Sequence, residues 1–151
     1  MNLMLAVAGM LAALAIPASA QQNPLFGTWE IVEAQPAPWV DEDKHTPLKA
    51  AGQRMIKQTV SFAAKQVTSK HKALACKRAM YETTEYQADA LFQGNLPEPN
   101  PTAAAARLGF KKGDVPSVDL RCSSGVYSYH FRDRNTVLTA LSNVIYTLRR
   151  Q

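Results

Sequence analysis

The sequence is poor in the residue types that build catalytic and metal centres. It holds two cysteines and three histidines among 151 residues. The histidines, His45, His71 and His130, have no regular ligand spacing. The acidic run before His45 could hold a cation, but it lacks the glycine of a calcium loop. No serine lies in a Gly-x-Ser-x-Gly setting, and no glycine-rich loop opens a helix. We therefore predict no catalytic residue, no metal site and no cofactor, and a protein that is not an enzyme.

Long apolar runs are missing as well, except at the N-terminus. Residues 3–16 are apolar or glycine, and Pro-Ala-Ser-Ala follows. An apolar segment of this length that ends in Ala-x-Ala is typical of a cleavable signal peptide, and it is shorter than the roughly 20 residues that span a bilayer. Gln21, not a lipid-attachment cysteine, follows the predicted cut. We expect a signal peptide at 1–20 and one domain at 21–151, periplasmic or secreted, soluble and not a lipoprotein.

The two cysteines, Cys76 and Cys122, both fall in the predicted mature part. Exported proteins meet an oxidising environment, so we expect these cysteines to form a disulfide. Closing a loop of this length stabilises the fold by roughly 4 kcal/mol on the chain-entropy model. The alternative is a catalytic thiol, which requires a partner that lowers its pKa.

Acidic residues are absent from Lys44 to Tyr81, although the net charge of the whole chain is only +5. The basic residues of this segment are Lys44, Lys49, Arg54, Lys57, Lys65, Lys70, Lys72, Lys77 and Arg78. Such a segment predicts a basic patch that could bind an anionic ligand, an envelope surface or an acidic protein. The simpler interpretation is a set of solvated lysines. Nucleic acid is not expected as a partner outside the cytoplasm.

The first two thirds of the domain predict few elements. Residues 26–34 read as a strand, with Trp29 and Ile31 on one face. Residues 35–56 contain three prolines and read as a long loop, which could form a lid. Strands are expected at 59–62 and 79–86, and 66–69 either continues or returns along the first of these. Residues 102–108 predict the one helix, between the N-cap Asn100 and Gly109.

The last third alternates apolar and polar residues most clearly. Strands are expected at 118–122, 127–131, 137–141 and 143–148, with turns between them. This spacing is typical of an antiparallel meander. The predicted fold class is mainly β: a meander closed into a small barrel by pairing of the first and last strands, with a sandwich as the alternative. A barrel of this size is either packed with side chains or holds one small ligand.

The motif Gly27-Thr28-Trp29 at the first strand resembles the Gly-x-Trp signature of the lipocalins and related calycins. The resemblance implies that Trp29 closes one barrel end and that an arginine of the last strand packs across it. Arg149 and Arg150 both fit that role, and we assign Arg149. The chain differs from the family in its mid-chain helix and in lacking a Thr-Asp-Tyr turn. Small exported enzyme-inhibitor barrels of bacteria are also similar in size and disulfide content.

The resemblance also implies that the long first loop covers the open end, with Trp39 and Val40 near a ligand entrance. His130 most simply faces solvent, and a lumen position is the alternative. The predicted ligand-mouth residues are Trp39, Lys57, Tyr127, Tyr129 and His130. We expect a lipocalin-like protein that binds a small apolar or amphiphilic, possibly anionic, ligand. The alternatives are a periplasmic inhibitor or protein-interaction barrel, and an envelope-associated structural protein.

Overall fold

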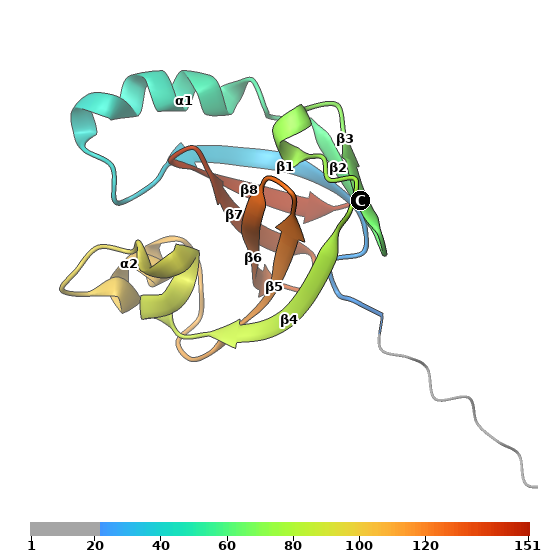
Figure 1. Ribbon diagram of the computed structural model, residues 1–151. Helices are drawn as coiled ribbons and strands as arrows, with labels where there is room; N and C mark the ends of the chain where they lie inside the picture. Colours follow the sequence, from blue (N-terminus) through green and yellow to red (C-terminus); the bar gives the residue numbers. More distant parts are fainter. Residues whose placement is uncertain (1–21) are drawn as a thin grey trace, which may run out of the picture.

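The computed structural model describes residues 22–151, so the predicted signal peptide lies outside the described residues. One antiparallel sheet of eight strands curls into a half-barrel (Figure 1). The fold is thus mainly β, and it forms one curled sheet rather than a two-sheet sandwich. The strands are β1 (Gly27–Pro36), β2 (Thr59–Ala63), β3 (Gln66–Ser69), β4 (Met80–Tyr86), β5 (Val115–Cys122), β6 (Gly125–Asp133), β7 (Thr136–Leu141) and β8 (Val144–Arg150).

The strand order is β3-β2-β1-β8-β7-β6-β5-β4. The first and last strands pair, as predicted, and they lie in the middle of the sheet. The segment 66–69 returns along β2 as a hairpin. The prediction of a closed barrel is wrong in one respect, because β3 and β4 form the two ends of the sheet order and no ladder joins them. The physical reason is length: β3 has only four residues, and the chain leaves it through a short helical turn, η2 (Lys72–Leu74).

A few specific contacts bridge the gap between β3 and β4. Val67 of β3 forms an isolated antiparallel bridge with Cys76, and Cys76 forms the predicted disulfide with Cys122 at the end of β5. The Ala79 N–H donates to the Lys65 carbonyl at 2.9 Å. The Tyr81 hydroxyl also donates to the Ala63 carbonyl at 2.8 Å. These contacts join the two edges at one end of the sheet, and within 22–151 no strand pairs with the outer edge of β4 from residue 82 to residue 86.

The concave side of the sheet is filled by large side chains. The Trp29 and Phe131 rings meet edge to face at 6.1 Å between centroids, and Phe62 and Tyr129 do so at 5.0 Å. Buried aliphatic residues fill the space between these pairs: Ile31, Val60, Val118, Leu120, Val137 and Leu148. The barrel interior is therefore a packed core.

The segment predicted as a long loop contains a helix, which is a correction. Helix α1 spans His45–Gln53 and follows a short turn, η1 (Glu42–Lys44). Pro47 falls in the first helical turn, where its missing N–H costs no hydrogen bond. Helix α1 lies across one end of the sheet, above β1 (Figure 1), with Gly52 packed against Ala34 and Val144. No helix within 22–151 is both long and apolar enough to cross a membrane.

A second apolar layer covers the convex side of β5 to β8. Turn η3 (Ala88–Gly94) and helix α2 (Pro101–Arg107) form it, and Leu91, Phe92 and Phe110 pack there on Leu138 and Ile145. The predicted helix is confirmed, because the Asn100 side chain accepts a hydrogen bond from the Ala103 N–H at 2.9 Å and Gly109 has a positive φ of 87°.

Candidate functional site

The end of the half-barrel that carries Trp29 holds a stacked arginine. The Arg150 guanidinium lies 4.2 Å from the centre of the Trp29 ring, and it donates hydrogen bonds to the carbonyls of Pro24 and Phe26. Arg149 instead lies opposite Glu30 and is exposed. Arg150, not the assigned Arg149, therefore packs across Trp29. The approach of Arg150 also leaves little room at Gly27, where an added Cβ would lie 3.2 Å from the guanidinium.

Trp39 lies on the outside of the half-barrel. Its indole N–H donates to the Asn143 side chain at 3.1 Å, and its ring contacts Phe92 at 5.8 Å between centroids. Ser142 and Asn143 form the tight β7–β8 turn, and both have positive φ. Trp39 thus holds this turn in place and does not line the interior.

Three other predicted ligand-mouth residues lie in three different environments. Tyr129 is buried against Phe62, and burial raises the pKa of its hydroxyl above the usual range. Tyr127 is half-buried, and its hydroxyl donates to Ser124 at 3.0 Å. Lys57 is exposed in the turn before β2. The structure does not gather the whole predicted set into one site, and only Trp39 and Tyr127 of this set line a common pocket, of about 80 Å³.

His130 faces outward from β6, but it is completely buried, so the prediction of a solvated histidine is wrong. Turn η3 covers it, and the Phe92 N–H donates to His130 Nε2 at 3.0 Å. His130 Nδ1 lies 2.8 Å from Ser117 Oγ. Desolvation lowers the pKa of His130 to about 4. The alternation of β6 predicted the outward direction, but it could not reveal a cover supplied by residues 88–110.

A pocket of about 320 Å³ remains at the end of the half-barrel that α1 covers. We call it the mouth pocket; it lies between the end of α1, the region of η2 and the β7–β8 turn. Its lining residues are Ala51, Arg54, Met55, Gln58, His71, Ala73, Leu141, Ser142 and Tyr146. Met55, Leu141 and the alanines make its apolar part, and the described lining contains no carboxylate.

The polar groups of the mouth pocket include the cation Arg54, several hydrogen-bond donors and the acceptor oxygen of Gln58. Burial raises the pKa of Tyr146 and so keeps the phenol protonated at neutral pH, although the positive charge of Arg54 partly opposes that rise. The Gln58 side-chain amide donates to the Arg54 carbonyl at 3.0 Å, while its oxygen is buried without a hydrogen-bond partner in the described chain. Arg54 and His71 belong to the basic segment, so this segment contributes to the lining of the mouth pocket. An anion with a small apolar part matches this combination.

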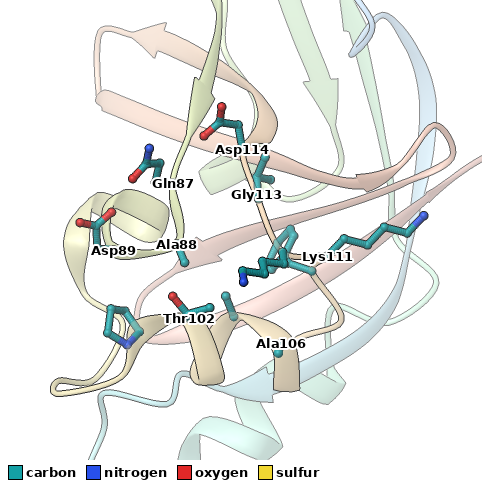
Figure 2. Close-up of a pocket in the computed structure, with 13 residues that line it drawn as sticks. Gln87, Ala88, Asp89, Thr102, Ala106, Lys111, Gly113 and Asp114 are labelled. Carbon is teal, nitrogen blue, oxygen red and sulfur yellow. The ribbon is translucent and has the colours of Figure 1, made fainter.

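A second pocket lies on the convex side, between η3, α2 and the loop before β5, with a volume of about 470 Å³ (Figure 2). Alanines of α2 and Phe110 form its apolar wall. Two acidic side chains, Asp89 and Asp114, and two basic ones, Lys111 and Lys112, line it. These charges balance, so the pocket has no electrostatic preference that defines a ligand.

A third pocket, of about 550 Å³, opens at the Trp29 end. We call it the arginine pocket, because Arg132, Arg134 and Arg150 line it together with a single carboxylate, Asp133. Its other lining residues are Pro24, Thr83, Pro116, Ser117, Phe131 and Asn135. Sequence reasoning missed this site, since its arginines come from the end of β6, the β6–β7 turn and β8, far from the basic segment.

Comparison with known proteins adds no relative: no family model, no curated protein and no solved structure matches this chain. The function is therefore argued from the fold and its pockets.

Proposed function

We propose that the protein is an exported, lipocalin-like binding protein that takes a small anionic ligand with an apolar part in the mouth pocket. The observation that carries the proposal is the lining of that pocket: one arginine, one histidine and a tyrosine above an apolar floor, with no carboxylate among the described residues. Ligand pockets commonly combine an apolar wall with a few placed polar groups. The role is one of binding and not of catalysis.

The packed interior limits the size of this ligand. Trp29, Phe62, Tyr129 and Phe131 occupy the space that a hollow barrel would offer to a long acyl chain. The 320 Å³ of the mouth pocket falls near the lower limit of typical small-molecule sites. A short amphiphile fits, with its head group at Arg54 and its apolar part against Met55 and Leu141.

Two features support a periplasmic or secreted location. The sequence begins with an apolar segment that ends in Ala-x-Ala, and the two cysteines of the chain form a disulfide. The lipocalin-like assignment is supported by the Trp29–Arg150 stack and by the meander order of the strands.

Octanoate provides a direct test, with octylamine as the matched ligand of opposite charge. We expect octanoate to bind the mature protein in calorimetric titration and octylamine not to bind. Replacing Arg54 with Gln should weaken octanoate binding about tenfold, because a charged head group loses its partner. Lys49→Gln, an exposed position on the same helix, is the control and should leave binding unchanged. Equal binding of both amphiphiles would contradict the proposal.

The packed interior also favours a second candidate, a protein-interaction role, because a filled barrel can present its loops and edges to a partner. Native mass spectrometry of the protein purified from its own compartment separates the two candidates. A small-molecule mass that is lost on denaturation supports ligand binding, whereas a protein adduct supports the second candidate.

A further inference from the structure

Strand β4 has one edge without a neighbour. It pairs with β5 from Met80 to Tyr86 and ends the sheet order. Within 22–151, no backbone hydrogen bond joins residues 82–86 to any strand other than β5. On such an edge, alternate N–H and C=O groups point away from the sheet, where they can pair with another extended chain.

The arginine pocket opens beside this edge. Thr83 of β4 lines the pocket and is exposed. Strand alternation places Thr83 and Glu85 on the same face of β4 as the inward Tyr81. A residue of an added strand that lies opposite Thr83 would point to this face as well, and so toward the arginines.

The pocket is charged and partly preorganised. The Arg150 guanidinium is held by the Phe26 carbonyl at 2.8 Å, and Arg132 contacts the Leu108 carbonyl at 3.4 Å. The Asp133 carboxylate already accepts the Asn135 N–H at 2.8 Å. Arg134 is exposed at the turn. Guanidinium groups in such an arrangement suit a carboxylate.

Contacts on the other face of β4 fix the edge. The Tyr86 hydroxyl donates to the Asp119 carboxylate at 2.6 Å, and Glu82 pairs with Arg121 at 3.3 Å. These contacts anchor both ends of the unpaired segment to β5. The edge is therefore ordered before any partner arrives, which reduces the entropic cost of pairing.

We propose that the β4 edge and the arginine pocket form one docking site for an extended segment of a partner protein. The segment adds antiparallel to β4, as in every other pairing of this sheet. It carries an acidic residue opposite Thr83 and, two positions earlier, a basic residue opposite Glu85. Backbone hydrogen bonds supply affinity, and the pocket supplies specificity. The site does not involve the mouth pocket.

The test uses a fluorescent peptide, acetyl-Thr-Val-Lys-Val-Glu-Val-Thr-Val-amide, titrated with the mature protein and followed by anisotropy. We expect saturable binding that weakens about tenfold when the peptide Glu becomes Gln or when the protein carries Arg134→Gln. Arg149→Gln is the matched control, an exposed arginine outside the pocket. Arg54→Gln, in the mouth pocket, should also leave binding unchanged, so this site and the proposed function fail separately.

Two N-methylated peptide series distinguish strand addition from simple charge attraction. Methyl groups on alternate amides block one edge of an extended peptide and leave the other intact. Strand addition requires that one series loses binding and the other keeps it. No binding at millimolar peptide, equal binding by both series, or equal loss in Arg134→Gln and Arg149→Gln would overturn the proposal.

Discussion

Hydrogen bonds around His130 fix its protonation state. The Ser117 hydroxyl donates to the Val115 carbonyl at 3.1 Å, so its oxygen accepts the proton on His130 Nδ1. The Phe92 N–H occupies Nε2 as an acceptor. We therefore assign the neutral Nδ1–H tautomer. A second proton on Nε2 would face the Phe92 N–H inside an apolar layer, which explains the low pKa.

This environment predicts an acid-sensitive fold. The folded pKa of His130 is about 4, below its usual value of 6.5, so the unfolded chain binds the proton more readily. The resulting stability is present above pH 6.5 and is lost as the pH falls toward 4. We expect the free energy of unfolding to drop by about 2 kcal/mol between pH 7.5 and 5 through this residue.

Urea denaturation at both pH values measures that drop. His130→Gln should be less stable at pH 7.5 but should lose less stability on acidification than the unchanged protein. His45 and His71 are present in both proteins, so the difference between the two pH dependences reports on His130 alone. An identical pH dependence in the variant would refute the assignment.

Helix α1 shows how an element can form without strong local signals. Its N-cap position is Lys44, which makes no side-chain capping bond, and Gly52 has a low helix propensity. The helix is held by packing: Gly52 lies against Ala34 and Val144, and Leu48, Met55 and Ile56 join the main core. Packing against β1 and β8, rather than the helix propensity of its residues, therefore stabilises α1.

This packing reverses the usual effect of a helical glycine. In an exposed helix, Gly→Ala stabilises by about 1 kcal/mol. At Gly52 a new Cβ would meet the Ala34 Cβ at 2.8 Å and Val144 Cγ1 at 3.2 Å. We expect Gly52→Ala to destabilise the fold by about 1 kcal/mol, since overpacking outweighs propensity. Thermal or urea denaturation measures the sign.

The control for this change is Ala50→Gly, at an exposed position of the same helix. It should cost about 1 kcal/mol by propensity alone. A more stable Gly52→Ala variant would mean that α1 does not press on the sheet.

The sequence predicted the strands and the helix that have a clear local pattern of apolar or capping residues. It did not predict the elements that depend on contacts with distant segments. Apolar alternation identified β5 to β8, and Asn100 with Gly109 identified α2. The cover over His130 and the helical form of 45–53 depend on contacts with other segments. The mouth pocket and the arginine pocket could not be predicted for the same reason. Arg54 and Tyr146 line the first and Thr83 and Arg150 line the second, and in both cases the residues come from distant parts of the sequence.

At the scale of the whole molecule, the disulfide replaces the missing ladder between β3 and β4. Cys76 bridges to Val67 on one side and bonds to Cys122 on the other. A covalent link across 46 residues limits the unfolded chain and should contribute about 4 kcal/mol. It also holds the gap of the half-barrel at one width near η2.

Loss of the disulfide should therefore act locally as well as globally. In the double variant Cys76→Ala/Cys122→Ala we expect a loss of about 4 kcal/mol in urea denaturation. Hydrogen exchange should accelerate most in β3 and at the start of β4, while β1, β7 and β8 keep their relative protection. The unchanged protein in reducing agent should behave alike. A uniform rise in exchange across all strands would contradict a role at the gap.

The pairing of β1 with β8 has a consequence for biosynthesis. Strand β1 lies in the middle of the sheet, between β2 and β8, and β8 is synthesised after the other seven strands. Until then the hairpins around β1 and the meander of β4 to β7 share no ladder, and only the contacts around Cys76 can join them. The ladder between β1 and β8 therefore forms only after β8 has been synthesised, and its contacts are long-range in the sequence. A variant truncated before Val144 would retain the other seven strands, but β1 and β7 would lose the strand that pairs with both of them.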